Sequence, residues 1–408
     1  MADENGLNRD HSSPGRAGVA LRYLRTVLLL YARRSRERRI QIINTAQPDN
    51  VSMRSGYWLA TIGTKNVIDG ATPLVVDALK RMQLSRSDTF CLTDMGCADG
   101  GSSMSLVRAC IEHVREQAPE RQISIVYTDQ PRNNYNALFG ILHGIEEGPM
   151  PSYLDDFDKV FATASGSSFY RQMVPDNSVD LGFSSTAMHW LSRKPCDISG
   201  HVQAIGAKGD ELAAFQRQGH SDWCTILEQR AREMRPGGRL VLVNFCKDEQ
   251  GRFLGNTEGV HMFDAFRDLW CQFADEGRIS ADEYQRMTLP QYYNSVEEFS
   301  APLTDTASAA HQAGLRLESI ETRVVECPFK ADFLKHGDAE HFATNYVPTL
   351  RSWTESTFHG ALDPARSAVE RTRLIDAYYQ RYADNVRAQP DGHGMDYVHA
   401  YIVIRKED

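Results

Sequence analysis

The stretch TDMGCADGG (Thr93–Gly101) decides the fold expected for this chain of 408 residues. It follows the apolar run FCL (residues 90–92) and precedes SMSLVRACIEHV, in which apolar residues recur at helical spacing. This order predicts a strand, a tight turn and an amphipathic helix. Small residues at positions 96, 98 and 100 let backbone N–H groups approach a ligand closely at the start of that helix. The stretch therefore predicts a ligand site at the carboxyl end of a strand.

A second stretch, TDQPRNNYN (Thr128–Asn136), lies about one strand–helix unit further along the chain. It places Asp129 at the carboxyl end of another short strand, residues 123–127, where a carboxylate accepts hydrogen bonds from the vicinal hydroxyls of a ribose. A dinucleotide site usually carries Gly-x-Gly-x-x-Gly for the pyrophosphate, whereas here Asp94 precedes small residues at alternate positions. The alternative is a turn with a structural role only. The Asp129 carboxylate at the end of the next strand favours a cofactor that contains a nucleoside.

Composition argues against several classes of protein. The formal net charge of −9 argues against a nucleic-acid-binding surface, which needs basic residues to displace counterions. The eight cysteines form no Cys-x-x-Cys pair and there is no His-Glu-x-x-His, so no metal site is predicted. The longest aliphatic run, residues 27–30, is far too short to span a bilayer. We expect a cytoplasmic protein without a nucleic-acid partner and without stable membrane insertion.

The first fifty residues differ in character from the rest. Residues 1–18 are polar and rich in turn-forming residues, which is typical of disorder, and residues 22–39 carry seven arginines against one acid. One interpretation of the second segment is a basic amphipathic helix that contacts an anionic membrane or acts in targeting. We favour a solvated helix whose leucine face packs on the body of the protein. Residues 1–50 are thus interpreted as an N-terminal extension of a domain over residues 51–408.

Strand and helix patterns alternate from residue 50 onward. Beyond the two strands above, the patterns predict helices at residues 67–81 and 209–234 and strands at residues 160–165, 179–185 and 240–245. Alternation of this kind predicts an α/β fold, with a mostly parallel sheet and helices on both faces.

The later part of the chain adds two strands and two insertions. The segments LRLESIETRVVEC and YVHAYIVIRK (residues 315–327 and 397–406) alternate like antiparallel edge strands. The insertions, at about residues 250–313 and 331–392, are predominantly helical. We expect them to form a helical cap over the carboxyl ends of the strands, where ligands bind in such sheets.

Several segments together resemble one family. GSSFYRQMVPDNSVDLGFSSTAMHWLS (Gly166–Ser192) resembles the Ser-Phe-Tyr…Pro…Ser-Ser-x-x-x-His-Trp-Leu-Ser stretch of the SABATH methyltransferases, which act on salicylate, benzoate, jasmonate, indole-acetate and theobromine-type substrates. DMGCADGG, TDQPRNNYN, MRPGGRLVL, YNSVEEF and RYADNV also resemble strings of that family. The resemblance runs from about Tyr57 to the C-terminus. It implies a Rossmann-like class I methyltransferase fold, S-adenosyl-L-methionine as cofactor, a small carboxylic acid as substrate, and a homodimer.

The resemblance also implies roles for individual residues. Ser168 and Phe169 match the pair beside the adenine, where a hydroxyl meets ring nitrogens and a ring face stacks. Trp190 matches the tryptophan whose indole N–H binds the substrate carboxylate, and His189 lies beside it, although a core position is the alternative for both. The implied cofactor-binding residues are Tyr57, Asp94, Gly96, Cys97, Asp129, Gln130, Ser168 and Phe169, and the implied substrate-binding residues are Thr64, Thr186, His189 and Trp190.

One departure from the family concerns the substrate. The family's N-terminal motif is Tyr-x-x-Asn-Ser-x-x-Gln, in which the glutamine clamps the acceptor carboxylate. In YWLATIGT, Ala60 and Thr61 stand where Asn and Ser would be, and Thr64 stands where Gln would be. The following KNVIDGATPL keeps the register. The resemblance therefore leaves the carboxylate clamp, and with it the substrate class, open.

The chemistry still favours a carboxylate acceptor. A carboxylic acid is ionised at neutral pH, so methyl transfer to it needs positioning rather than a general base, and no residue is assigned a catalytic proton transfer. We expect the methyl ester of a small aromatic or otherwise hydrophobic acid. Two alternatives stay open: an N-methyltransferase of a heterocyclic amine within the same family, and a dinucleotide-dependent oxidoreductase or non-catalytic cofactor-binding protein.

Overall fold

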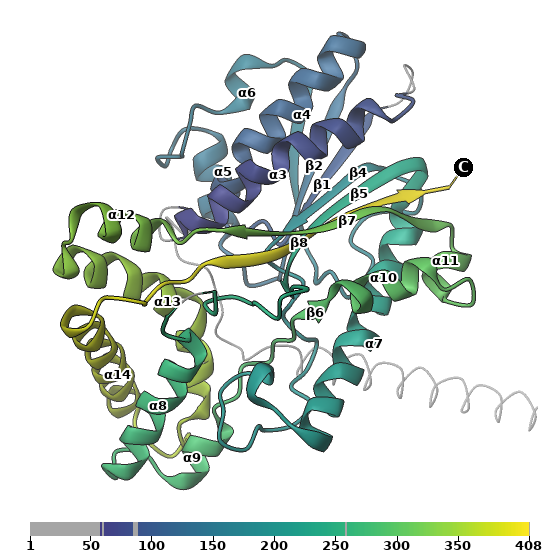
Figure 1. Cartoon of the computed structure of the whole chain (residues 1–408). Coiled ribbons are helices and arrows are strands. Elements are labelled where there is room, and N and C mark those ends of the chain that lie inside the picture. Colours follow the sequence, from purple (N-terminus) through teal and green to yellow (C-terminus); the bar gives the residue numbers. More distant parts are fainter. Residues whose placement is uncertain (1–57, 59–60, 85–88, 258, 408) are drawn as a thin grey trace, which may run out of the picture. The chain divides into compact units, whose positions relative to one another are not determined.

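A single eight-stranded sheet forms the centre of the computed structural model, which describes residues 58, 61–84, 89–257 and 259–407 (Figure 1). These residues belong to one unit, Gln47–Asp408. The other unit, Met1–Ala46, lies outside the described residues, and so does the basic segment predicted at residues 22–39.

The strand order of the sheet is β3-β2-β1-β4-β5-β8-β7. Neighbouring strands from β3 to β5 pair in parallel, whereas β8 pairs antiparallel with both β5 and β7. A short strand, β6, pairs with the end of β5. The predicted α/β fold with a mostly parallel sheet is confirmed. The strands are β1 Phe90–Met95, β2 Ile123–Asp129, β3 Val160–Gly166, β4 Val179–Ser185, β5 Met234–Lys247, β6 Asn294–Ser295, β7 Leu315–Val325 and β8 Tyr397–Lys406.

The prediction that residues 397–406 form an edge strand is wrong, because β8 lies between β5 and β7. Its residues from Tyr397 to Ile404 are buried. Val398 and Ile402 pack into the core on one face of the sheet, while Tyr401 and Val403 pack on the other. The strand is apolar in both phases of its alternation, which is typical of a strand covered on both faces.

Helices cover both faces of the sheet (Figure 1). On one face, α3 (Ile62–Lys80) and α4 (Met104–Gln117) share one core cluster with every second residue of β1 and β2, such as Leu92 and Ile125. On the other face, α7 (Gly209–Glu233) and α10 (Val296–Thr304) pack with the remaining alternate residues. Small helices lie in the connections: η1 Gly101–Ser103, α5 Tyr135–Leu142, α6 Tyr153–Asp156, η2 Ala204–Gly206 and α11 Ala309–Gln312.

The segments predicted to form the cap do not all lie in one place. Five helices gather at the carboxyl ends of the strands, and their aromatic side chains pack together, with the rings of Phe358 and Tyr378 4.5 Å apart. By contrast α10 and α11, which fall within the predicted cap segment 250–313, pack against β7 and α7. The five gathered helices are α8 Met262–Asp275, α9 Ala281–Arg286, α12 Pro328–His336, α13 Ala339–Ala361 and α14 Ala368–Ala388.

A buried ion pair on α7 holds the loop that follows β3. Arg230 and Glu233 are 1% and 2% exposed, and Nε of Arg230 lies 2.7 Å from Oε2 of Glu233. The same guanidinium donates to the carbonyl oxygens of Phe169 (2.9 Å) and Arg171 (2.8 Å), while Oε1 of Glu233 accepts the N–H of Met173 at 2.5 Å. The pair thereby fixes the backbone of the loop that carries Ser168 and Phe169.

We expect Glu233→Gln to lower the free energy of unfolding by about 3–5 kcal/mol, because it leaves the buried Arg230 guanidinium without its counter-charge. Urea denaturation followed by circular dichroism measures this change. Glu355→Gln removes one of the two carboxylate partners of Arg351, in a partly exposed pair on α13, and is the control, for which we expect little change. Equal effects of the two substitutions would contradict the role given to the buried pair.

Candidate active site

One cavity opens at the carboxyl ends of the parallel strands and measures about 1300 Å³ including its open mouth. Tyr57 lies outside the described residues. The other residues predicted for the cofactor and the substrate come from the start of α3 and from the ends of β1 to β4. They all line this cavity: Thr64, Asp94, Gly96, Cys97, Asp129, Gln130, Ser168, Phe169, Thr186, His189 and Trp190.

The turn after β1 has a backbone that only small residues permit. Gly96, Ala98 and Gly100 have φ values of 81°, 50° and 72°, in the left-handed region. A Cβ on Gly96 would also lie 2.5 Å from the Cβ of Ala187, in the segment after β4. The turn therefore combines a left-handed conformation with a close approach to its neighbour, and it leaves room for a ligand at the strand ends.

Asp129 sits at the end of β2 with both carboxylate oxygens in defined positions. Oδ2 accepts the N–H of Ala98 at 2.8 Å, and Oδ1 accepts the N–H of Gln130 at 2.6 Å. Burial raises the pKa of this carboxyl, while the two backbone donors act in the opposite direction. Each oxygen keeps a further lone pair, so the group can still accept hydrogen bonds from a vicinal diol.

Asp94 is a second buried carboxyl on the same side of the cavity. It is 4% exposed, and Oδ2 accepts a hydrogen bond from the hydroxyl of Ser103 at 2.6 Å. Burial raises the pKa of Asp94 to about 7, the Ser103 hydrogen bond opposes the rise, and the nearby Asp129 charge adds to it. A cationic group of a ligand would reverse this balance and favour the ionised form.

Two hydroxyls in the cavity fit a ligand that is rich in polar atoms. Ser102 Oγ and Thr128 Oγ1 are buried, and neither has a hydrogen-bond partner within the described residues. Buried hydroxyls are normally paired, because an unmet hydrogen bond is costly. Together with the Asp129 carboxylate and the small-residue turn, they form a set of donors and acceptors that matches a nucleoside with an amino-acid tail.

The opposite wall of the cavity is aromatic and uncharged. Phe245 on β5 packs between two imidazoles, with ring centroids 4.8 Å from His189 and 4.2 Å from His399. Burial lowers the pKa of His189 to about 3, so its ring is neutral at physiological pH. Half-buried Trp190 follows His189 on the same segment. This wall can exclude water and offer neutral donors, but its described residues include no strong base.

Sequence reasoning missed several lining residues. Trp353 and Thr349 come from α13, and Phe245 comes from the middle of the sheet. Gln291 lies opposite Trp190 in an antiparallel bridge. Its only signal in the sequence was its position two residues before the family-like string YNSVEEF. The α13 residues had no local signal, because only the packing of the cap brings them to the cavity.

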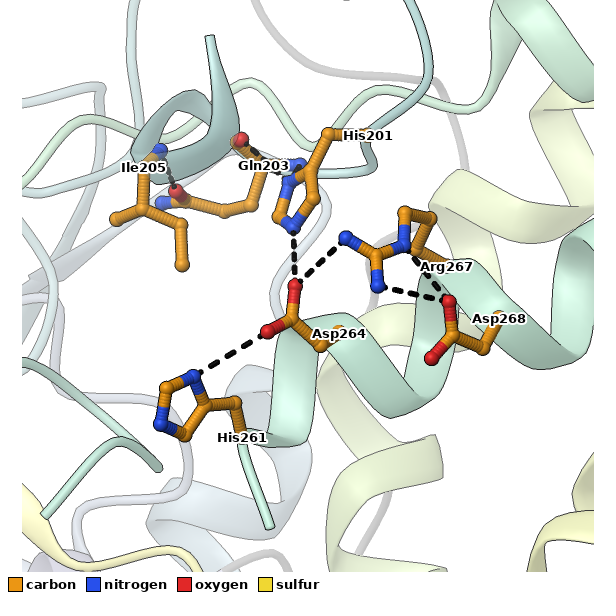
Figure 2. A network of polar contacts seen from close by, with 7 residues as sticks. All are labelled: His201, Gln203, Ile205, His261, Asp264, Arg267 and Asp268. Carbon is orange, nitrogen blue, oxygen red and sulfur yellow. Dashed lines mark hydrogen bonds and ion pairs between the residues drawn. The ribbon is translucent and has the colours of Figure 1, made fainter.

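One carboxylate, on α8, connects the segment after β4 to the cap (Figure 2). Asp264 on α8 lies 3.2 Å from Nε2 of His201 and 3.2 Å from Nδ1 of His261, and it accepts a hydrogen bond from Arg267 at 2.9 Å. His201 is 7% exposed, so its ring is held between the two segments. These side chains do not line the cavity described above.

Two general properties of the described residues bear on the chemistry. No three His, Cys, Asp or Glu side chains among them converge as a metal ion would require. Among the helices that the structure describes, none combines the length and apolar character needed to cross a membrane.

Comparison with known proteins gives a family for most of the chain. The family model described as SAM dependent carboxyl methyltransferase matches residues 55–407. Among curated proteins, indole-3-acetate O-methyltransferase 1 of Arabidopsis thaliana is 24% identical over 257 residues, which cover 58% of this chain and 67% of that enzyme. Indole-3-acetate O-methyltransferase 1 of Oryza sativa subsp. japonica is 26% identical over 249 residues, which cover 53% of this chain and 60% of that enzyme.

A solved structure supports the fold independently. The structure of loganic acid methyltransferase with SAH aligns with a TM-score of 0.69 at 19% identity, and the alignment covers 89% of this chain and 99% of that one. At this identity the likeness bears on the fold alone.

We expect the affinity for S-adenosylmethionine to fall as the pH drops below about 7. Burial keeps the ligand-free Asp94 carboxyl protonated below that pH, whereas a cationic ligand beside it needs the ionised form, so binding there must release a proton. Isothermal titration calorimetry between about pH 5.5 and 8.5 should show up to a tenfold loss per pH unit on the acid side and a plateau above. Asp94→Asn should flatten this profile, and an unchanged slope in the variant would rule out Asp94 as its source.

Proposed function

This chain belongs to the family of SAM-dependent carboxyl methyltransferases, and we propose that it converts a small hydrophobic carboxylic acid into its methyl ester. One observation carries this function. A single cavity joins a cradle of small residues, carboxylates and hydroxyls to a wall of aromatic side chains and neutral hydrogen-bond donors. The first part suits a nucleoside cofactor, and the second suits an apolar acid.

The cofactor of this family is S-adenosylmethionine, which supplies an electrophilic methyl group on a sulfonium. We assign the ribose to Asp129, whose two oxygens are positioned by backbone donors. The adenine is assigned to Ser168 and Phe169, on the loop that Arg230 holds, and the amino-acid tail to the turn at Gly96 and to Asp94. The unpaired hydroxyls of Ser102 and Thr128 supply further polar contacts at this end.

The acceptor side supports a carboxylate because its described lining residues include no effective base. His189 is the imidazole that lines the cavity, and with a pKa near 3 it is too weak a base to deprotonate a phenol or an ammonium group. A carboxylic acid loses its proton in water before it binds. The residues of this wall therefore need only to orient the carboxylate towards the methyl group and to exclude water. Trp190 is the donor that we assign to the carboxylate.

The lining residues also indicate the kind of acid. Phe245, Trp353, Leu254 and Met395 make this end of the cavity apolar, so we propose an aromatic or otherwise hydrophobic acid. Thr64 lines the same cavity with a short side chain and leaves space where a glutamine would reach inward. The family match does not favour the N-methyltransferase or oxidoreductase alternatives.

We also propose a homodimer in the cytoplasm. The homodimer rests on the family resemblance, and multi-angle light scattering on the purified protein tests it. The compartment is supported by the cysteines, since all eight lie among the described residues and all are free. Reducing compartments keep cysteines in that state.

Incubation with methyl-labelled S-adenosylmethionine should give a labelled methyl ester from at least one member of a panel of small acids: benzoate, salicylate, cinnamate, phenylacetate, indole-3-acetate and octanoate. Mass spectrometry identifies the product, which mild alkali should hydrolyse. EDTA should leave the turnover unchanged, because the reaction needs positioning and not a metal. A labelled product that resists alkali, as an N-methyl compound or a methyl ether does, would reject carboxyl methylation.

Trp190→Phe should lower kcat/KM for the acid by about one to two orders of magnitude, because the ring survives while the indole donor is lost. The affinity for S-adenosylhomocysteine should stay the same. Trp223→Phe is the control, since Trp223 is buried and donates to the carbonyl of Phe299 away from the cavity. We expect that control to keep the wild-type kcat/KM. Full activity in Trp190→Phe would show that the carboxylate binds elsewhere.

A further inference from the structure

The acceptor wall lacks a glutamine at position 64 but has one at position 291. Gln291 lines the cavity and is 1% exposed. Its Oε1 accepts a hydrogen bond from the hydroxyl of Tyr293 at 3.1 Å, whereas its Nε2 has no partner within the described residues. Resting on the function proposed above, we propose that the Gln291 amide donates to the acceptor carboxylate and replaces the donor missing at Thr64.

The pairing of two short segments places this amide beside Trp190. The N–H of Leu191 donates to Pro290 O at 2.8 Å, and the N–H of Tyr292 donates to His189 O at 3.0 Å. These two bonds flank Trp190 and Gln291, which form an antiparallel bridge and do not bond each other. Side chains of such a directly opposed pair lie on the same face and close together. The indole and amide donors therefore approach the cavity from one direction.

Tyr293 gives the amide its orientation. Its hydroxyl occupies Oε1, so the NH₂ group is the end of the amide left for a ligand. Tyr293 is itself 5% exposed and packs against His189 and Phe245, with ring centroids 5.9 Å and 5.6 Å away. A side chain held in this way loses little freedom when it binds, which is what a positioning donor needs.

The segment that carries Gln291 is anchored to the cap. The N–H of Leu289 donates to Val202 O at 2.8 Å, and the adjacent His201 is tied to Asp264 of α8 through its ring (Figure 2). The backbone of Gln291 is thus held on one side by the Trp190 segment and on the other by residues fixed to α8. Both anchors are independent of the first turn of α3, where Thr64 lies.

The charges of the cavity explain why this donor matters. The acceptor side has no Lys or Arg among its described lining residues, so neutral N–H groups must satisfy the carboxylate. Buried amide groups are rarely left unpaired in proteins, and an anion with several lone pairs satisfies the Gln291 N–H without requiring a counter-charge. A cationic amine or another N–H donor would leave the N–H groups of Gln291 without an acceptor. Gln291 therefore selects acids over amines.

The reaction that follows from this placement balances without proton transfer. A carboxylate oxygen forms a bond to the methyl carbon while the bond between that carbon and sulfur breaks, and the electron pair of that bond stays on the sulfur of the departing thioether. The indole of Trp190 and the amide of Gln291 each occupy lone pairs of the carboxylate. A lone pair that neither donor occupies can then point at the methyl group, as in-line displacement requires.

Gln291→Glu is the decisive variant, because it keeps the shape of the side chain and turns a donor into an anion. The ligands are the panel acid with the highest kcat/KM and its primary amide, which has nearly the same shape without the charge. Calorimetry in the presence of S-adenosylhomocysteine should show wild-type protein preferring the acid. In the variant, binding of the acid should weaken by about a hundredfold or more and the preference should invert towards the amide, since a carboxylate repels the acid and accepts the amide N–H.

Two further variants separate positioning from structure. Gln291→Met removes the donor without adding charge, and it should raise KM for the acid by about tenfold while the affinity for S-adenosylhomocysteine stays unchanged. Asn244→Asp is the matched control: Asn244 on β5 is also a buried amide whose Nδ2 has no partner among the described residues, but it does not line the cavity. It should keep the wild-type preference for the acid.

Each outcome has a separate meaning. An unchanged acid-to-amide preference in Gln291→Glu, or an unchanged KM in Gln291→Met, would overturn the assignment while carboxyl methylation stands. If Gln291→Glu does not fold, Gln291→Met decides. If the wild-type protein makes no methyl ester from any panel acid, the proposed function fails first and the assignment fails with it.

Discussion

The contact between the turns after β1 and β4 sets the geometry on which the site depends. A side chain at Gly96 would collide with Ala187, so the two turns lie in close contact. In the strand order the crossover from β1 leads to β2, whereas that from β4 leads to β5 in the opposite direction. A crevice opens where such connections diverge. The cavity occupies this crevice, and the carboxyl ends of the parallel strands supply much of its lining.

Sequence patterns predicted those parts of the fold and site that depend on local order. Asp129 and Gly96 follow apolar runs, and the parallel register brings their strand ends to one edge whatever the rest of the chain does. The central place of β8 escaped prediction because antiparallel pairing with β5 and β7 joins segments far apart in sequence. Trp353 escaped for a similar reason, since only the docking of α13 brings it to the cavity.

The carboxylates of the cavity lie at one of its ends, and uncharged side chains line the other. Asp94 and Asp129 lie at the end assigned to the cofactor, whereas the acceptor end holds a neutral His189 and aromatic rings. Such a division suits a reaction between a cation and an anion, because the carboxylates stabilise the cationic ligand and no Lys or Arg among the described lining residues competes with it for the acid. A lysine at the acceptor end would bind the acid more tightly but would also stabilise its charge in the ground state, where that charge must be available for attack.

The position of the acceptor donors has a consequence for assembly. A glutamine at position 64 would depend on the first turn of α3, whereas Gln291 depends on the pairing of its segment with Trp190 and on the bond from Leu289 to Val202. That segment is fixed in turn by the contact between His201 and Asp264 on α8. The donor set for the acid is therefore complete only when the connection after β4 and the cap are docked together. In this proposal Asp264, which does not line the cavity, helps to position the segment that carries Gln291.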